Sequence, residues 1–482
     1  MTEMMFRKKV LACWFGKNIG GTLGGPYEGF PECNDLTFYD PVPCGSMPND
    51  DLELQAMYAA ALARMEKPEI NREILADIWL EHMNFHCDEY AVAMRNLALG
   101  IRPPWSGSYD NYYVNGMGAA IRSELWACLA PGDPALAARF AYEDACIDHA
   151  GDGIDAEVFF AVVESLAFVE ADIRTIIDAG LASLPPDSVL AEGIRMACSL
   201  WDSTGDWRAV RDALFRRYAT EFKTDVRINI PFTVLALLSG EGDFGKTICL
   251  AVNCGQDADC TGATVGAIFG IINPDLISEE WLKPIGHSLV VSKEINGIQP
   301  PATLEAFTEL VAGLRNRVTL KDAPETEFDL KPFAIPARRS VFHPWFAGDF
   351  RKFNPALSDN AETVLLPGNL TTIDFSALPG ESLLMLETEF RVEADRVVRL
   401  LVNTPANMQV WVDGVFRFGR ECGGMVPAFH RAMQNQLAEF ELKAGLHKLL
   451  IGLAPATPEM KHADLLFGIA DTKNHWLPNA FR

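Results

Sequence analysis

Apolar positions follow a helical period over roughly the first two-thirds of the chain and a period of two beyond it. Up to about residue 316, proline and glycine stand mainly at breaks between apolar helical runs. From residue 321 to 339, Pro324, Pro332 and Pro336 occur among charged residues, which is typical of a linker. The pattern predicts an all-α domain over residues 1–320, a linker over 321–339 and a smaller all-β sandwich over 340–482.

Two segments of the C-terminal region predict β-hairpins. Val410 to Phe418 alternates around Asp413-Gly414, a dipeptide that favours a tight turn between antiparallel strands. Glu439 to Leu453 alternates around Ala444-Gly445 and predicts a second hairpin. Several such strands together predict a sandwich of about 140 residues.

Two segments of the N-terminal region predict helices with a glycine face. Glycine at every fourth position lies on one side of a helix, where another backbone can approach closely. The first stripe comprises Gly16, Gly20 and Gly24, and the second comprises Gly262, Gly266 and Gly270. We expect the second helix to pack in the all-α core.

Two carboxylates precede the second glycine-striped helix. Asp257 and Asp259 stand where the helix dipole and unpaired N–H groups favour negative charge. Adjacent oxygen ligands also suit a hard cation such as Mg²⁺ or Mn²⁺. The alternative is an N-cap beside a solvated acid, which requires no ligand.

A second acidic motif, Asn49-Asp50-Asp51, lies more than two hundred residues upstream, ahead of another predicted helix. Asp50 and Glu53 fit a capping box, which would account for one of the acids. The neighbouring pair of carboxylates stays unexplained, because adjacent like charges repel each other and are better tolerated around a shared cation.

Other polar positions are candidates for catalysis or substrate contacts. Glu28 follows the turn 25–27, where a loop could hold it over a pocket, although such acids are usually solvated. Residues 101–124 combine turn formers with a helix start, which suits an anion or a sugar but equally an ordinary loop. His149 and Asp152 lie at a polar break between apolar helices, which favours a pocket, although a lone histidine is most often a packed residue.

The net charge and the cysteines restrict partners and compartment. A formal charge of −24 opposes binding to nucleic acid and to acidic membrane surfaces. Eleven cysteines without a CxxC pair favour reduced thiols over a disulfide framework. The apolar run 10–15 is too short for a signal peptide, and no segment reaches membrane-spanning length without charge. We therefore expect a soluble cytoplasmic protein.

With these motifs in this order, residues 5–315 resemble the ADP-ribosylglycohydrolase family, whose relatives include the dinitrogenase reductase-activating glycohydrolases and the J1 crystallins. The resemblance implies an all-helical fold that binds two Mg²⁺ or Mn²⁺ ions between an early Ser/Thr-Asp-Asp motif and a late Asp-x-Asp-Thr motif. The positions that match these motifs, and which the resemblance assigns to metal binding, are Asn49, Asp50, Asp51, Asp257, Asp259 and Cys260.

The resemblance also implies roles outside the two motifs. Glu28 ends a segment similar to the family's opening segment, and Asp110 falls where some members carry a functional acid. Asn115-Gly116-Met117-Gly118 through Arg122 looks like the ribose-binding loop, and His149 matches a substrate-side histidine.

Two positions depart from the family pattern. Asn49 replaces a hydroxyl residue, although its amide oxygen can still ligate a hard cation. Cys260 replaces a threonine ligand, and a thiol is a poor partner for Mg²⁺. The departures leave open one ion or two, a water-completed site, or an altered metal preference.

The leading hypothesis is a metal-dependent hydrolase of ribosyl-type glycosides, small or protein-linked, with ADP-ribosyl conjugates as the first substrates to test. Glu28 or Asp110 would transfer the proton that cleavage at an anomeric carbon requires, and Asp152 would lie with the substrate-binding residues. One alternative is a hydrolase of O- or N-glycosides that does not act on ADP-ribose, and another is a non-catalytic ADP-ribose- or carbohydrate-binding protein.

The C-terminal sandwich looks like the jelly-roll modules appended to glycoside hydrolases, so a carbohydrate-binding or accessory function is expected for it. Trp411 or Phe429 could stack on a sugar, but aromatic residues of this kind more often belong to a core.

Overall fold

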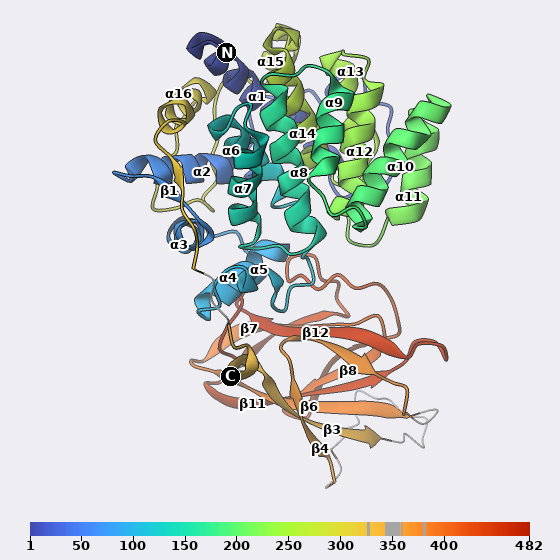
Figure 1. The fold of residues 1–482 in the computed structure, drawn as a ribbon. Helices are drawn as coiled ribbons and strands as arrows, with labels where there is room; N and C mark the ends of the chain where they lie inside the picture. The colour runs from blue at the N-terminus through green and yellow to red at the C-terminus, as the bar shows by residue number, and fades with distance from the viewer. Residues whose placement is uncertain (325–327, 343–356, 358–359, 379–381) are drawn as a thin grey trace. The chain divides into compact units, whose positions relative to one another are not determined.

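The structure is a computed structural model that describes residues 1–324, 328–342, 357, 360–378 and 382–482 (Figure 1). Contacts divide the chain into two compact units. Unit 1 comprises residues 1–85, 102–108 and 113–324, and unit 2 comprises residues 86–101, 109–112 and 325–482. Residues 325–327 of the expected linker lie outside the described residues, and the first long strand, β3 (Ile335–Phe342), begins within that expected linker.

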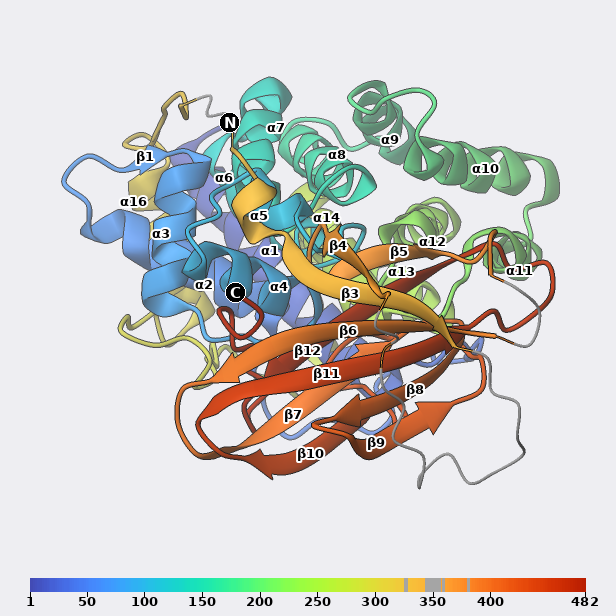
Figure 2. The ribbon, with the colours of Figure 1, turned by 90° about the horizontal axis from the view of Figure 1, so that it is seen from below.

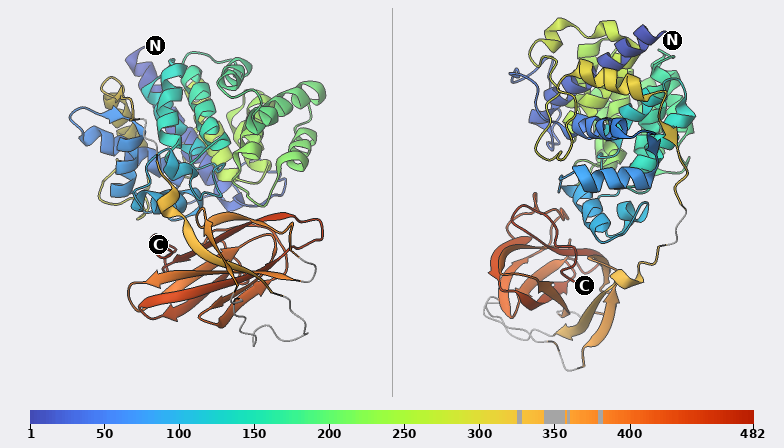
Figure 3. Two further views of the ribbon diagram at one scale, coloured as in Figure 1. Left: turned by 60° about the horizontal axis from the view of Figure 1, so that its bottom comes forward. Right: turned by 90° about the vertical axis from the view of Figure 1, so that its left-hand side faces the viewer.

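Unit 1 is helical, as its apolar periodicity predicts, and Figure 3 shows its helices from two further sides. Its α-helices are α1 (Glu3–Gly24), α2 (Asp50–Arg64), α3 (Arg72–His82), α5 (Trp105–Ser108), α6 (Ser123–Leu129), α7 (Pro134–Ala145), α8 (Asp152–Ala167), α9 (Ile173–Ala182), α10 (Val189–Thr204), α11 (Trp207–Tyr218), α12 (Val226–Ser239), α13 (Phe244–Asn253), α14 (Ala258–Ile272), α15 (Glu279–Leu282) and α16 (Leu304–Leu314). The shorter elements are the 3₁₀ helices η1 (Gly25–Tyr27), η2 (Ala120–Arg122) and η3 (Pro274–Leu276) and the paired strands β1 (Glu69–Ile70) and β2 (Thr319–Leu320).

Several of these helices begin at aspartates that cap them. The side chains of Asp133, Asp206, Asp225 and Asp243 accept backbone N–H groups at the starts of α7, α11, α12 and α13. These N–H groups have no partner within the helix, so a carboxylate at the cap stabilises the helix start. Helix α10 ends at Gly205, whose φ of 60° is left-handed. Local sequence therefore accounts for many of the helix ends.

The two glycine stripes pack against each other, because α1 and α14 lie side by side along them (Figure 1). A Cβ atom added at Gly20 would lie 2.7 Å from Ala263 N, and one added at Gly262 would lie 2.8 Å from Gly20 O. Two helix backbones approach this closely only where side chains are absent. Helix α14 also contacts α8, α12 and α13. The prediction of a tightly packed glycine-striped helix in the all-α core is confirmed.

Unit 2 contains two antiparallel sheets (Figure 2). The larger sheet has the strand order β4-β3-β6-β11-β8-β9, and the smaller has the order β10-β7-β12-β5. One core joins the inner faces, with Leu386 and Ile451 from the larger sheet and Leu400 and Phe467 from the smaller. The further strands are β4 (Glu362–Leu366), β5 (Leu370–Asp374), β6 (Leu383–Val392), β7 (Arg396–Asn403), β8 (Asn407–Val412), β9 (Val415–Arg420), β10 (Leu437–Leu442), β11 (Gly445–Ala454) and β12 (His462–Ala470).

Unit 2 also takes in helix α4 (Asp88–Ala98) and the 3₁₀ helix η4 (Lys331–Phe333). Ala91 of α4 belongs to an apolar cluster with Leu401 and Trp476 of the sheet region. A helix from the N-terminal part of the sequence is thus part of the core of unit 2.

The two predicted hairpins have different outcomes. Strands β8 and β9 pair around Asp413-Gly414, where both residues have positive φ, so this prediction is confirmed. The hairpin around Ala444-Gly445 is wrong, because β10 pairs with β7 in the smaller sheet and β11 pairs with β6 and β8 in the larger. Asp395 accepts hydrogen bonds from Ala444 N and Lys443 Nζ and so holds the connection between the sheets.

The two aromatic residues considered for sugar stacking are core residues. Trp411 is 1% exposed and packs with Met385 and Leu450 on one face of the larger sheet. Phe429 is 3% exposed and belongs to the cluster that contains Trp476. Because neither ring is accessible, the interpretation as core aromatics is confirmed.

Candidate metal centre

The two acidic motifs meet where α2 and α14 begin. Cys260 Sγ, in the first turn of α14, lies 3.7 Å from Asp51 Oδ2, in the first turn of α2. Two sets of ligand atoms result, with the atoms of each set within 4.8 Å of one another. We name them the thiol position (Asp51, Asp259 and Cys260) and the carboxylate position (Glu28, Asp257 and Asp259). Because Asp259 belongs to both positions, they form one continuous site in unit 1.

Backbone hydrogen bonds bring Glu28 to the late motif. Gly29 N donates to Gln256 O at 2.8 Å, and Gln256 N donates to Phe30 O at 2.7 Å. These two bonds form a short antiparallel bridge between the loop after η1 and the residue before the late motif. Gly255 has a φ of 75°, and a Cβ atom there would collide with backbone oxygens of the same loop. The late motif therefore depends on glycine at this position.

The interpretation of the late motif as a cap beside a solvated acid is wrong. Asp257 occupies the N-cap position of α14, but its side chain makes no capping hydrogen bond. Asp257 and Asp259 are 1% and 8% exposed, so neither is solvated. Asp257 Oδ2 and Asp259 Oδ1 are buried and accept no hydrogen bond from the part of the chain that the structure describes. A cation fits these oxygens, because a buried carboxylate oxygen without a donor is otherwise destabilising.

At the early motif, the helix is capped by Asn49. Its Oδ1 accepts a hydrogen bond from Asp51 N at 2.8 Å, so the amide oxygen expected as a metal ligand serves the cap. Glu53 Oε2 accepts hydrogen bonds from Ser292 N and Oγ and does not complete a capping box with Asp50. The capping-box prediction is wrong, because Asn49 and not Asp50 is the N-cap and Glu53 is bonded to Ser292.

The carboxylates of the centre favour their protonated forms when no cation is bound. Burial, followed by repulsion from Asp51 and Glu28, raises the pKa of Asp50 to about 7. Burial likewise raises the pKa of Asp257 and of Asp259 well above the usual range, and repulsion among these carboxylates adds to the shift. A bound divalent cation would offset both causes and hold the carboxylates ionised.

Lys17 is a buried cation beside the centre that sequence reasoning missed. It is 1% exposed, and its Nζ lies 2.7 Å from Glu124 Oε1 and 3.4 Å from Asp51 Oδ1. Burial lowers the pKa of the ammonium, but the Glu124 and Asp51 carboxylates outweigh burial and raise it. Gln55 Nε2 also donates to Glu124 Oε2 at 2.9 Å. The sequence does contain a signal for this residue, because Lys17 stands within an apolar helical run and is therefore expected to be buried. A buried ammonium requires an acidic partner, so such a lysine predicts a buried ion pair.

Asp110 lies in unit 2, and its carboxylate binds the backbone of that unit. Its Oδ2 accepts a hydrogen bond from Asn369 N at 2.7 Å, and its Oδ1 accepts one from Leu370 N at 3.2 Å. Arg95 Nη2 lies 3.5 Å from Asp110 Oδ2. Asp110 thus holds the start of β5, and the catalytic role expected for it stays a prediction.

The residues expected to bind substrate lie in unit 1, outside the two ligand positions. The loop Asn115-Gly116-Met117-Gly118 is fixed to the start of α12, because Asn115 O accepts a hydrogen bond from Val226 N at 2.9 Å. His149 is fully buried, with its Nδ1 2.9 Å from Asp148 Oδ1. Asp152 begins α8 and is half-buried. Their contacts with a substrate stay predictions.

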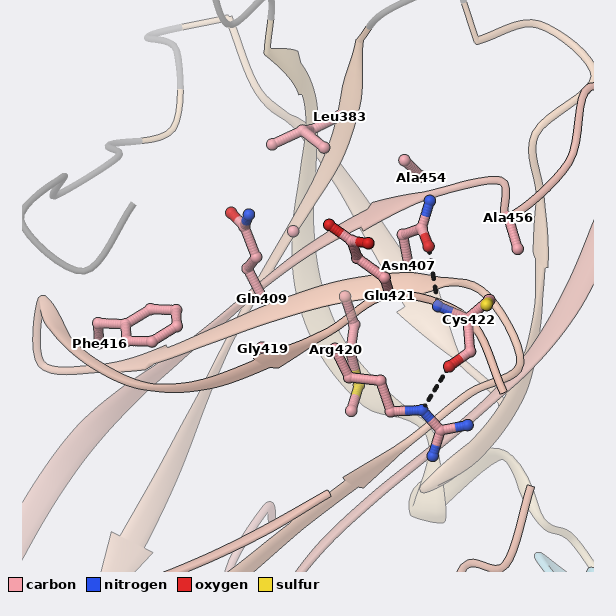
Figure 4. Close-up of a pocket in the computed structure, with 12 residues that line it drawn as sticks. Leu383, Asn407, Gln409, Phe416, Gly419, Arg420, Glu421, Cys422, Ala454 and Ala456 are labelled. Carbon is pink, nitrogen blue, oxygen red and sulfur yellow. Dashed lines mark hydrogen bonds between the residues drawn. The ribbon is translucent and has the colours of Figure 1, made fainter. Parts of the chain in front are cut away.

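Unit 2 contains a cavity of about 660 Å³ against β8 and β9 (Figure 4). Arg420 Nε donates to Cys422 O at 2.8 Å, and Cys422 N donates to Asn407 Oδ1 at 2.9 Å, so these polar groups hold the rim of the cavity. Among the described residues that line it, Glu421 is the one acid. The described lining of the cavity therefore lacks the paired carboxylates that the centre in unit 1 provides.

Unit 1 is thus a helical unit in which two acidic motifs meet at the starts of two helices, with side chains that could hold a metal ion. The sequence model of the ADP-ribosylglycohydrolase family matches residues 2–317, and the chain belongs to that family. The resemblance seen in the sequence is thereby confirmed.

Solved structures that match the chain include an ADP-ribosylglycohydrolase-related protein complex, which is 19% identical over 65% of this chain and 99% of that chain, with a TM-score of 0.45. A β-glucosidase from Kluyveromyces marxianus in complex with glucose is 6% identical over 28% of this chain and 16% of that chain, with a TM-score of 0.20. No curated protein matches the chain. Among the described residues, no helix combines the length and apolar character needed to cross a membrane.

Proposed function

We propose that the chain is a divalent-metal-dependent glycohydrolase that cleaves a ribosyl-type glycosidic bond, with ADP-ribosyl conjugates as the first substrate class. The observation that carries the proposal is the meeting of both acidic motifs with Glu28 in one site. Family membership supports an ADP-ribosyl glycoside, small or protein-linked, as the substrate. Mg²⁺ or Mn²⁺ is the proposed cofactor, because carboxylate oxygens predominate among the ligand atoms.

The aspartates of the two motifs would hold the metal. Asp257 and Asp259 each supply a buried oxygen without a donor among the described residues, and Asp51 faces them from α2. Asp50 adds a further carboxylate beside these three. When bound, a divalent cation orients the sugar hydroxyls or a water and stabilises charge that develops near the anomeric carbon.

Glu28 is the carboxylate that we assign to proton transfer. It is exposed, whereas Asp257 and Asp259 of the same ligand position are buried, so a water or substrate can reach it. Cleavage through an oxocarbenium-like transition state requires a carboxylate that accepts or donates a proton. Glu28 suits this role better than Asp110, because both oxygens of Asp110 accept backbone hydrogen bonds. The 115–118 loop, His149 and Asp152 are proposed to contact the substrate.

Asp257→Asn tests the proposal, because it keeps the shape of the side chain and removes its charge. The full chain is assayed with Mn²⁺ on ADP-ribosyl-arginine, ADP-ribosyl-serine and nitrophenyl glycosides. We expect release of ADP-ribose from one of the first two and a loss of about a hundredfold or more in the variant. Asp243→Asn is the matched control, since Asp243 is an exposed N-cap and asparagine caps equally well.

Other outcomes separate the alternatives. Cleavage of nitrophenyl glycosides alone would favour a hydrolase that does not act on ADP-ribose. Tight binding of ADP-ribose without turnover, across a series of metals, would favour a binding protein. Absence of divalent-cation binding in calorimetry would refute the proposal.

A further inference from the structure

The thiol and carboxylate positions differ in ligand chemistry. We propose that the centre binds two different classes of divalent cation. The thiol position takes a cation with affinity for sulfur, such as Zn²⁺, and the carboxylate position takes a hard cation such as Mg²⁺ or Mn²⁺. This inference rests on the proposed metal centre and is independent of the substrate.

The thiol position has the ligand set of a sulfur-binding cation. Its three ligand residues, Asp51, Asp259 and Cys260, are all buried, and their ligand atoms lie within 4.8 Å of one another. Zn²⁺ binds cysteine sulfur and carboxylate oxygen, and catalytic zinc sites have three protein ligands with a fourth place for water or substrate. Thiolate sulfur favours such cations over Mg²⁺, which prefers six oxygen ligands.

The carboxylate position offers oxygen alone. Asp257 and Asp259 supply buried oxygens, and the exposed Glu28 lies within 4.8 Å of them, so water can complete the coordination of a hard cation at this side of the centre. Asp259 Oδ1 is buried and accepts no hydrogen bond within the described residues, which leaves this oxygen available to a cation. The shared Asp259 carboxylate would link the two cations.

The surroundings of Cys260 fix its sulfur toward the centre. Cys260 Sγ lies 3.7 Å from Asp51 Oδ2, while Lys17 Nζ lies 3.4 Å from Asp51 Oδ1. The two oxygens of Asp51 therefore face different partners. Oδ2, which lies beside the thiol, is the oxygen that can bind the same cation as Cys260 Sγ. The next hydroxyl in the chain does not compete, because Thr261 Oγ1 donates to Ala258 O at 3.2 Å within the helix.

Cobalt titration provides a test that does not depend on activity. The full chain is stripped of metal with a chelator, kept reduced, and titrated with Co²⁺ while near-ultraviolet absorption and bound metal are followed. We expect two Co²⁺ per chain, with a thiolate-to-cobalt charge-transfer band from one of them. Excess Mg²⁺ should displace the other ion and leave the band in place.

Variants assign the band to its sulfur. Cys260→Ser should lose the band and weaken binding of that Co²⁺ by about tenfold or more, since even partners that only support a metal ligand contribute that much. Cys254→Ser, six residues away at another buried cysteine, should keep the band. Cys260→Ala replaces the serine variant if circular dichroism shows that the latter is unfolded.

The outcomes separate this inference from the proposed function. Co²⁺ binding without a band in the unaltered chain, or a band that survives Cys260→Ser, would overturn the two-cation inference and leave the metal centre intact. Failure of the unaltered chain to bind any divalent cation would overturn both the inference and the proposed function.

Discussion

Replacing Lys17 by methionine isolates the charge that this residue places beside the metal centre. Methionine keeps the length of the side chain but leaves the buried Glu124 and Asp51 carboxylates without their ammonium partner. Removing one member of a buried ion pair costs about 3–5 kcal/mol, because an uncompensated charge stays in the interior. Such a loss is large against the roughly 5–15 kcal/mol by which a domain is stable.

Thermal unfolding followed by helical circular dichroism, without divalent cations, measures this loss. For a unit of this size, 1 kcal/mol shifts the midpoint by about 2 °C, so Lys17→Met should unfold about 6–10 °C lower. Lys246→Met is the matched control in the same unit, because Lys246 pairs with Glu241 at the surface. Exposed pairs contribute about 0–1 kcal/mol, so the control should shift by about 2 °C or less.

A double variant sharpens the test of this reasoning. Glu124→Gln should destabilise the Lys17→Met chain less than it destabilises the unaltered chain, because it then removes an unpaired charge instead of breaking a pair. A midpoint for Lys17→Met within 2 °C of the control would refute the role of Lys17 as the neutralising cation. Equal effects of Glu124→Gln in both backgrounds would refute the coupling.

Three further predictions concern packing, catalysis and acid stability. Gly266→Ala should lower the free energy of unfolding in urea by about 1–3 kcal/mol or more, because the added methyl group overlaps the backbone of α1. Gly313→Ala is the control and should be neutral or stabilising, because open space surrounds Gly313. Glu28→Gln should lower turnover about a hundredfold or more with the fold unchanged by circular dichroism. Unit 2 should lose stability as pH falls from about 6.5 to 4, because burial and His475 lower the pKa of His86 to about 4.

Each of these predictions has a result that contradicts it. Equal stability of the two glycine variants would contradict close contact between α1 and α14. Unchanged turnover in Glu28→Gln would move proton transfer to another carboxylate. Below about pH 6.5 the unfolded chain takes up a proton on His86, and the folded unit does not. His86→Phe should therefore reduce the loss of stability in acid. An unchanged dependence of stability on pH in this variant would contradict His86 as its cause.

Features that depend on neighbours in the sequence could be predicted. The helical and two-residue periods predict where the helices and strands lie, because they reflect which face of each element is buried. The Asp413-Gly414 turn follows from the ease with which both residues adopt positive φ. Each glycine stripe follows from four-residue spacing, although the pairing of the two stripes is a tertiary contact that spacing does not specify.

Features that depend on distant partners could not be predicted. The sequence around Ala444-Gly445 favours a turn, but whether the flanking strands pair is decided by the other strands of each sheet. Glu28 and Asp110 are both acids in polar loops, so the sequence predicts an exposed functional group equally well at either position. The structure distinguishes them, because the oxygens of Asp110 accept hydrogen bonds from backbone N–H groups about 260 residues away. The partners of Lys17 also lie outside its own helix, since Asp51 lies in the first turn of α2 and Glu124 belongs to α6.

The glycine stripe of α1 explains why the two acidic motifs meet at all. A Cβ atom at Gly24 would lie 2.5 Å from the carbonyl carbon of Ala258, so the end of α1 touches the start of α14. A Cβ atom at Gly21 would lie 2.6 Å from Asn49 Nδ2, so the same turn of α1 also touches the cap of α2. Because Glu28 follows Gly24 by four residues, the close approach of the glycines at the end of α1 sets the positions of both motifs and of the proton-transfer carboxylate. Packing and chemistry therefore depend on the same residues, because a side chain at Gly24 would overlap the backbone at the start of α14, where the late motif lies.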